Sequence, residues 1–138
     1  SWVISAHGKN FVKTMLKLSK SKDELNVVGD QIGSPTPAKD IAITCMQIAK
    51  FLQIDQSKSG VYHYSGTPDI SWANLASEIF CQAGLSTRIN SILSVDYSTT
   101  AVRPLNSRLD CSTTQKIFNI PRPNWRLGLK LILKELEV

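Results

Sequence analysis

The sequence predicts an α/β fold with parallel connections between its strands. Two observations carry this prediction: short apolar segments rich in β-branched residues recur along the chain, and amphipathic helical segments of roughly 10–15 residues separate them. A chain of 138 residues that is 42% hydrophobic can bury one core and is too short for two full-sized domains. We therefore expect a single α/β unit.

The first three elements follow from local patterns. Residues 2–5 are typical of the end of a strand, and Asn10 is a favoured N-cap for a helix over 11–20. Residues 25–29 form an apolar run of strand length. These segments predict a strand, a helix and a strand in that order.

A turn and a second helix come next. Residues 33–36 predict the turn, with Thr36 as the N-cap of the helix and Pro37 at its first helical position. The helix carries an apolar stripe at helical spacing, which consists of Ile41, Cys45, Ile48, Ala49 and Leu52.

The middle of the chain repeats the alternation. Residues 60–65 hold one valine and two tyrosines and predict a strand, and a turn over 66–69 follows. Ser71 is expected to cap a third helix that ends at Gly84.

The last third predicts one more strand and two helices. Residues 89–95 have β-branched content, and residues 96–105 are expected to be a loop. Residues 111–118 predict a helix, and two prolines then interrupt the chain. Asn124 is expected to cap a final helix that runs to residue 137.

Composition excludes several classes of protein. No apolar run approaches the roughly 20 residues that span a bilayer, and residues 1–9 do not have the architecture of a signal peptide. Cys45, Cys81 and Cys111 are odd in number and widely spaced. This usage favours buried thiols in a reducing compartment, so we expect a cytoplasmic protein.

The net charge of +5 raises the question of nucleic-acid binding. Four lysines at helical spacing share one side of the first predicted helix, and apolar residues lie mainly on the other. We interpret the lysines as a solvated face, because no aromatic–basic interleaving, zinc spacing or helix-turn-helix pattern accompanies them. The lysines are Lys9, Lys13, Lys17 and Lys20.

The chain shows no complete catalytic apparatus. His7 and His63 are isolated from cysteines and carboxylates at metal-ligand spacing, so no metal site is expected. The sequence contains no G-x-S-x-G, no P-loop and no G-x-G-x-x-G. None of the three tyrosines has a lysine four residues later.

Two polar runs predict a binding pocket instead. Residues 28–37 lead from a strand end into a turn whose polar groups cannot all pair internally, and residues 103–110 place an arginine beside a proline, an asparagine and a serine. Together they predict two walls of a pocket for an anionic, hydroxylated ligand.

Five motifs occur in one order along the chain. They are S-W-V at residue 1, N-F at 10, D-Q-x-G-S-P-T at 30, G-V-Y-H at 60 and R-P-x-N-S-x-L at 103. Their order and spacing resemble the C-terminal half of the dTDP-4-dehydrorhamnose reductases, a family of extended short-chain dehydrogenases/reductases. The resemblance implies the last strands of a Rossmann-like parallel sheet plus a small α/β substrate lobe.

The resemblance also implies which parts this chain lacks. In the family, an N-terminal half carries the glycine-rich cofactor loop and a Y-x-x-x-K helix, both expected before Ser1. Residues 1–138 would then form the substrate-binding portion, with no catalytic residue of their own. The unpaired edge of the first strand would be apolar and long, which leaves a homo-oligomer as an option.

The implied reaction is hydride transfer from NADPH or NADH to the C4 keto group of dTDP-4-dehydro-L-rhamnose. The product, dTDP-L-rhamnose, would serve the synthesis of surface polysaccharide. The expected partner is therefore a dTDP-sugar, with neither nucleic acid nor membrane. Some relatives bind magnesium through C-terminal carboxylates, but Glu135 and Glu137 are better interpreted as an exposed helix end, and no metal is predicted.

Site residues carried over from the resemblance each have a second interpretation. Arg103 is a phosphate ligand, or it forms a surface ion pair or anchors the loop, and Trp2 is a sugar platform or a core residue. Asn10 is a sugar contact or a cap, while Asn106 and Ser107 bind ligand or satisfy local backbone. The expected substrate residues are Trp2, Asn10, Gln31, Arg103, Asn106 and Ser107, and the expected loop-shaping residues are Gly33, Pro35, Thr36 and Pro104.

Two other functions stay open at this level. One is a non-catalytic binding subunit of the same fold, similar to the regulatory beta subunit of methionine adenosyltransferase. The other is a different extended-family enzyme, such as a sugar epimerase or dehydratase. An intact Y-x-x-x-K upstream would favour a catalytic protein over the regulatory subunit.

Overall fold

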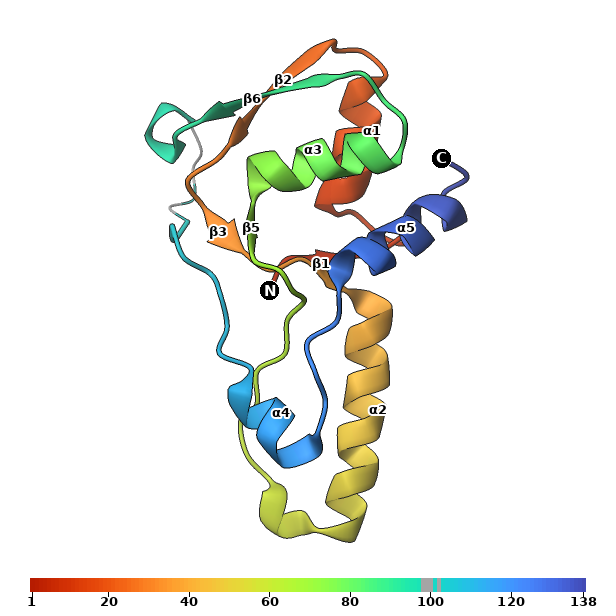
Figure 1. The fold of residues 1–138 in the computed structure, drawn as a ribbon, viewed down its shortest axis with the longest axis vertical. Helices are drawn as coiled ribbons and strands as arrows, with labels where there is room; N and C mark the ends of the chain where they lie inside the picture. Colours follow the sequence, from red (N-terminus) through yellow and green to blue (C-terminus); the bar gives the residue numbers. More distant parts are fainter. Residues whose placement is uncertain (98–100, 102) are drawn as a thin grey trace.

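Figure 1 shows the computed structural model, which describes residues 1–97, 101 and 103–138. The upper part of the view holds strands β2 and β6 and helices α1 and α3, and α5 lies beside them. Helix α2 extends away from this part, with α4 next to it. The loop expected over 96–105 includes residues 98–100 and 102, which lie outside the described residues.

Two pairs of strands are parallel, which confirms the predicted α/β class. β1 (Val3–Ile4) pairs with β4 (Thr36–Pro37), and β2 (Glu24–Val28) pairs with β6 (Arg88–Ile92). Helices occupy the connections between the paired strands, as parallel pairing requires. β6 is shorter than the strand expected over 89–95, because a 3₁₀-helix (Ser94–Asp96) follows it.

A third pairing was not foreseen. β3 (Ile32–Gly33) runs antiparallel to β5 (Ile70–Ser71), and Ile32 also forms a parallel bridge with Asn106 on its other side. The predicted turn over 33–36 is therefore partly extended backbone. Its ends belong to two different strand pairs, which a local turn pattern cannot indicate.

Three helices begin at the caps that the sequence predicts. Asn10 caps α1 (Phe11–Ser19), Ser71 caps α3 (Trp72–Gln82) and Asn124 caps α5 (Trp125–Glu135), and in each case the cap side chain accepts a backbone N–H of the first turn. Gly84, just after α3, has a φ of 66°, a conformation that glycine adopts without steric cost.

The start of α2 (Ala38–Ile54) corrects the prediction for Thr36 and Pro37. Pro37 is the N-cap and makes no side-chain cap hydrogen bond, while Thr36 lies in β4. The Thr36 hydroxyl is hydrogen-bonded to the carbonyl oxygens of Ser1, at 2.9 Å, and Ser34, at 3.0 Å. Pairing with β1 holds this backbone extended, so the hydroxyl joins β4 to its neighbours instead of capping the helix.

The strand predicted over 60–65 is wrong, since this segment has no ladder partner. It follows a short 3₁₀-helix (Gln56–Lys58) and runs past α4 (Ser112–Phe118). Thr114 donates to the carbonyl of His63 at 2.5 Å, and the rings of Tyr62 and Phe118 meet edge-on with centroids 4.7 Å apart. Contacts with a helix replace the expected sheet.

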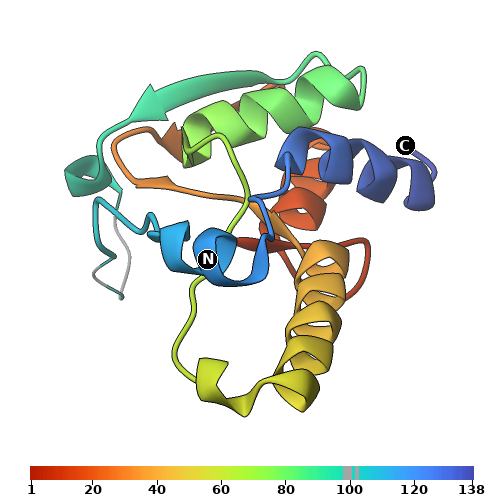
Figure 2. The same ribbon diagram turned by 60° about the horizontal axis from the view of Figure 1, so that its bottom comes forward.

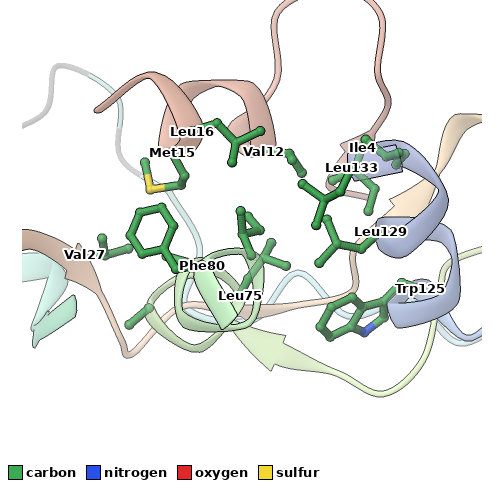
Figure 3. Packing of buried hydrophobic residues seen from close by; sticks show 14 of the residues in the cluster. Ile4, Val12, Met15, Leu16, Val27, Leu75, Phe80, Trp125, Leu129 and Leu133 are labelled. Carbon is green, nitrogen blue, oxygen red and sulfur yellow. The ribbon is translucent and has the colours of Figure 1, made fainter. Parts of the chain in front are cut away.

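The hydrophobic core lies where α1, α3 and α5 meet the β2–β6 pair, as Figure 3 shows. Val12, Leu75 and Leu129 come from the three helices and are fully buried. Trp125 is also fully buried, and its indole Nε1 donates to the carbonyl of Pro68 at 2.7 Å, so its one polar atom is satisfied.

Helix α2 buries much less than its stripe predicts. In Figure 1 it extends away from the three core helices, and in Figure 2 only its first turns lie close to them. Only Thr44 is buried on it, and its exposed large apolar residues are Ile43, Met46, Phe51 and Ile54. Within the described residues, no helix is long and apolar enough to cross a bilayer.

The expectation of buried thiols is confirmed for one of the three cysteines. All three cysteines are free thiols, but Cys45 and Cys81 are exposed and only Cys111 is buried. Cys45 lies on the poorly covered helix α2, and Cys81 lies on the outer face of α3. Position inside an apolar helix pattern therefore did not ensure burial.

The core can be tested with two leucines of α5. Leu129 is fully buried and Leu131 is 60% exposed. We expect Leu129→Ala to lower the free energy of unfolding by about 2–5 kcal/mol, because it removes buried methyl groups and leaves a cavity. Leu131→Ala, the matched control, changes it by about 0.5 kcal/mol or less. Urea denaturation measures both, and equal effects would contradict this packing.

Candidate functional site

A cavity of about 650 Å³ opens between α1, β2, the first residue of α3 and the segment after β6. This volume is within the range of small-molecule sites. The wall is mainly apolar and aromatic, with Phe11, Trp72 and Tyr97 among its residues. Arg103 is the one charged side chain among the described residues that line it. The cavity therefore combines a flat apolar wall with a single positive charge.

Gln31 brings a primary amide to this cavity. The residue is only 9% exposed, yet its side chain makes no hydrogen bond with any residue of the described part of the chain. The amide is not fully enclosed, since Gln82 Oε1 is the one enclosed side-chain polar atom without a hydrogen-bond partner among the described residues, so the Gln31 amide faces the cavity without a protein partner. A bound ligand with one donor and one acceptor can supply that partner.

Arg103 is exposed and lines the same cavity. Within residues 1–97, 101 and 103–138, its guanidinium forms no ion pair or hydrogen bond with another side chain. The surface ion pair offered as its second interpretation is thus not present among these residues. The guanidinium is positively charged and has several donors for an anion.

The aromatic wall is built by stacking. The indoles of Trp72 and Trp2 are stacked with centroids 3.5 Å apart and an interplanar angle of 13°. Phe11 contacts Trp72 from another side, with centroids 4.6 Å apart. Trp72 lines the cavity and Trp2 lies behind it, so Trp2 supports the wall and has one face covered.

Several contacts fix Trp2. Its Nε1 donates to the Ser107 hydroxyl at 3.2 Å, and its carbonyl accepts the amide of Thr36 at 3.1 Å. The residue has a φ of 49°, which is unusual for a bulky side chain. Gly33 lies so close to the indole that a Cβ at this position would overlap it. Glycine at residue 33 therefore permits the approach of Trp2.

Three predicted site residues have partners within the chain. Asn10 donates to the carbonyl of Ser5 at 2.7 Å, in addition to its cap. Asn106 accepts the backbone amide of Arg108 at 3.1 Å, and Ser107 donates to the carbonyl of Ile32 at 3.2 Å. These side chains stabilise the surroundings of the cavity and do not line it.

The four expected loop-shaping residues do not line the cavity. Pro35 is fully buried, and its carbonyl packs so closely on Gly66 that a Cβ there would overlap it. Thr36 accepts the amide of Gly66 at 3.1 Å. Pro104 is exposed and directly follows Arg103. The backbone of residues 33–36 is thereby held against the loop before β5.

Asp30 anchors the wall that contains Ser94. Its carboxylate accepts the backbone amide of Ser94 at 3.0 Å and the Ser94 hydroxyl at 2.8 Å. The hydrogen bond from that backbone amide is the main cause that lowers the pKa of Asp30. Ser94 lines the cavity, so this carboxylate fixes the segment that carries Tyr97.

Sequence reasoning missed the aromatic residues of the wall. Trp72 follows the cap Ser71, and Tyr97 lies in an expected loop, so neither position departs from an ordinary pattern. Tyr97, six residues before the R-P motif, was the available signal, whereas Trp72 lies far from both motifs in the sequence. Among the described residues, no group of three or more His, Cys, Asp or Glu could hold a metal ion.

Comparison with known proteins identifies relatives of the whole chain. The profile of a family described as "RmlD substrate binding domain" matches residues 1–138. A dTDP-4-dehydrorhamnose reductase of Sinorhizobium fredii is 43% identical over 131 residues, which are 91% of this chain and 44% of that protein. The chain spans about half the length of the curated relatives that it matches.

Solved structures that resemble this chain carry the same name as these relatives. A dTDP-4-dehydrorhamnose reductase of Clostridium acetobutylicum superimposes with a TM-score of 0.89 at 30% identity, covering 100% of this chain and 47% of that chain. The enzyme of the same name from Bacillus anthracis, in complex with NADP, gives a TM-score of 0.82 at 33% identity, covering 98% of this chain and 46% of that chain.

The Asp30 anchor predicts a pH dependence of stability. The folded pKa is lowered, so Asp30 stabilises the fold fully above its unfolded pKa, about 3.9, and this contribution is lost as pH falls through the folded value. We expect Asp30→Asn to flatten the loss of unfolding free energy between neutral and acid pH. Urea denaturation at a series of pH values measures the free energy of unfolding. Asp23→Asn, at an exposed position, is the control. Parallel curves for wild type and Asp30→Asn would refute the anchor.

Proposed function

Because this chain belongs to the RmlD substrate-binding domain family, we propose that residues 1–138 form the substrate-binding portion of an NAD(P)H-dependent dTDP-4-dehydrorhamnose reductase. The observation that carries this proposal is the cavity in which an amide and a guanidinium, both without side-chain partners in the described part of the chain, converge with an aromatic wall. A nucleotide sugar has a flat base, a charged diphosphate and hydroxyl groups, and each matches one of these features.

Each ligand group has a candidate partner in the proposal. Arg103 binds the diphosphate, since its charge and its forked donors suit phosphate oxygens. Gln31 makes hydrogen bonds to a group with both donor and acceptor character, and Trp72 gives a face for stacking. Trp2, Asn10, Asn106 and Ser107 act around the cavity, because the structure gives their side chains partners or positions outside it.

The reaction also needs a reduced nicotinamide, which supplies the hydride to the C4 keto group of dTDP-4-dehydro-L-rhamnose. This sequence contains neither a glycine-rich dinucleotide loop nor a Y-x-x-x-K, so its residues do not fit the cofactor by themselves. We propose that another part of the full-length protein holds both. The role of this chain is to capture and orient the dTDP-sugar, whose product serves the synthesis of surface polysaccharide.

A non-catalytic regulatory subunit is the less favoured alternative. The relatives compared above carry the name of a reductase, and one of the superimposed structures contains NADP. Cytoplasmic location and assembly into a homo-oligomer stay predictions from the sequence.

Arg103→Ala tests the phosphate partner. We expect this change to weaken dTDP binding about 10- to 100-fold, because a hydrogen bond to a charged group is removed. Isothermal titration with dTDP measures the affinity. Arg88→Ala is the control, because Arg88 is an exposed arginine of β6 that pairs with Glu24 of β2. Equal affinity of Arg103→Ala and wild type would place the diphosphate elsewhere.

Gln31→Leu should separate binding from stability. Leucine removes the amide, which is not enclosed, so we expect the free energy of unfolding to change by about 0.5 kcal/mol or less while dTDP affinity falls about tenfold. Thermal denaturation and titration measure the two effects. Gln53→Leu, at an exposed position of α2, is the control. A fall in stability with unchanged affinity would show that the amide is paired within the protein.

Turnover tests the reductase itself. The full-length protein is mixed with NADPH and dTDP-4-dehydro-L-rhamnose, and the loss of absorbance of the reduced cofactor is followed. We expect turnover, and Arg103→Ala should reduce kcat/KM mainly through a higher KM. A protein that binds NADPH and dTDP without turnover would favour the regulatory alternative.

A further inference from the structure

Arg122 joins three segments that are far apart in the sequence. Its Nη2 donates to Asp69 Oδ1 at 2.6 Å and to Ser34 Oγ at 3.1 Å, and the Ser34 hydroxyl donates to the same carboxylate oxygen at 2.7 Å. Its Nε donates to the carbonyl of Ser65 at 3.2 Å, and Nη2 also bonds the carbonyl of Gly66. We call Arg122, Asp69 and Ser34 the Arg122 clamp.

The clamp continues a very short strand pair. In the antiparallel ladder, Ile32 faces Ser71 and Gly33 faces Ile70. The next position outward pairs Ser34 with Asp69, the two residues that Arg122 holds together. A ladder of only two residue pairs has few hydrogen bonds of its own, so the side-chain contacts of the clamp extend it by a third pair at one end.

The other end of the same ladder faces the cavity. One position beyond the Ile32–Ser71 pair lie Gln31 and Trp72, and both line the cavity. A slip of one residue between β3 and β5 would exchange the faces on which these side chains lie. The alignment of the amide with the indole therefore depends on the register of two residue pairs.

We propose that the Arg122 clamp is a positioning device that holds the β3–β5 ladder in register, so that Gln31 and Trp72 keep their places in the wall of the cavity. None of its three residues lines the cavity, so its effect on a ligand is indirect. The part of this inference that concerns dTDP rests on the proposed function, whereas the placement of the wall does not.

The electrostatics of Asp69 agree with this role. Burial alone raises the pKa of Asp69, but hydrogen bonds from Arg122 and Ser34 and the charge of Arg122 outweigh it, and the pKa is lowered. The carboxylate is thus kept ionised, and the clamp stays closed at neutral pH and well into the acid range.

The stacked indoles provide a readout that needs no ligand. Two indoles in van der Waals contact couple electronically and give a paired signal in the far-ultraviolet circular dichroism, which Trp2→Ala identifies by removing it. We expect Arg122→Gln to weaken this signal and to reduce dTDP affinity about tenfold, equivalent to the loss of one ligand hydrogen bond. Asp69→Asn, which keeps the shape and removes the charge, should have a smaller effect in the same direction.

Arg126→Gln is the matched control. Arg126 pairs with Glu78 at 3.2 Å with similar exposure, and among the described residues its hydrogen bonds do not join it to β3 or β5. All proteins are compared well below their melting temperatures, so a general loss of stability does not enter the comparison. We expect Arg126→Gln to keep the indole signal and the dTDP affinity within twofold of wild type, a change that is small on the scale of one hydrogen bond.

The outcomes separate the two proposals. If Arg122→Gln melts earlier but keeps both the indole signal and the affinity, the clamp is only structural and the inference fails. If wild type does not bind dTDP while Arg122→Gln loses the indole signal, the clamp stands and the proposed function fails. If Arg122→Gln does not fold, Asp69→Asn decides, and an unchanged signal in that variant overturns the inference.

Discussion

Ile32 is the residue at which three distant segments meet, because its backbone is paired on both sides. Its amide donates to the carbonyl of Leu105 at 2.8 Å, its carbonyl accepts the amide of Ser107 at 2.8 Å, and Ser71 lies opposite it across the β3–β5 ladder. Arg103, Gln31 and Trp72 each lie within two residues of one of these pairings. Backbone pairing at Ile32 therefore brings Arg103, Gln31 and Trp72 close together, and their side chains then form the wall of the cavity.

The fold could be predicted where the signal is local. Asn10, Ser71 and Asn124 mark helix starts because a cap hydrogen bond involves only neighbouring residues. Thr36 has the same chemistry but pairs with a strand more than 30 residues earlier, and that pairing overrides the cap. The tyrosine-rich run over 60–65 has strand propensity, yet no neighbouring strand lies beside it.

The sequence predicted the part of the candidate site that has a local signal. Gln31 and Arg103 lie in polar runs that have too many hydrogen-bonding groups for a simple turn, and both line the cavity. Trp72 could not be found this way, because a tryptophan after a cap is ordinary in any amphipathic helix. Its role depends on Trp2, whose contact with it is visible only in three dimensions.

The hydrogen bond from Trp2 to Ser107 joins residues 105 positions apart in the chain. Contacts of such separation form late in folding, because a long loop must close before they add stability. A ribosome adds roughly 5–20 residues per second, so Ser107 is synthesised on the order of ten seconds after Trp2. During this interval the indole of Trp2 has neither its hydrogen-bond acceptor nor the completed wall around it. The cavity is therefore assembled only after residue 103 has been synthesised, because its described lining residues extend from Phe11 to Arg103.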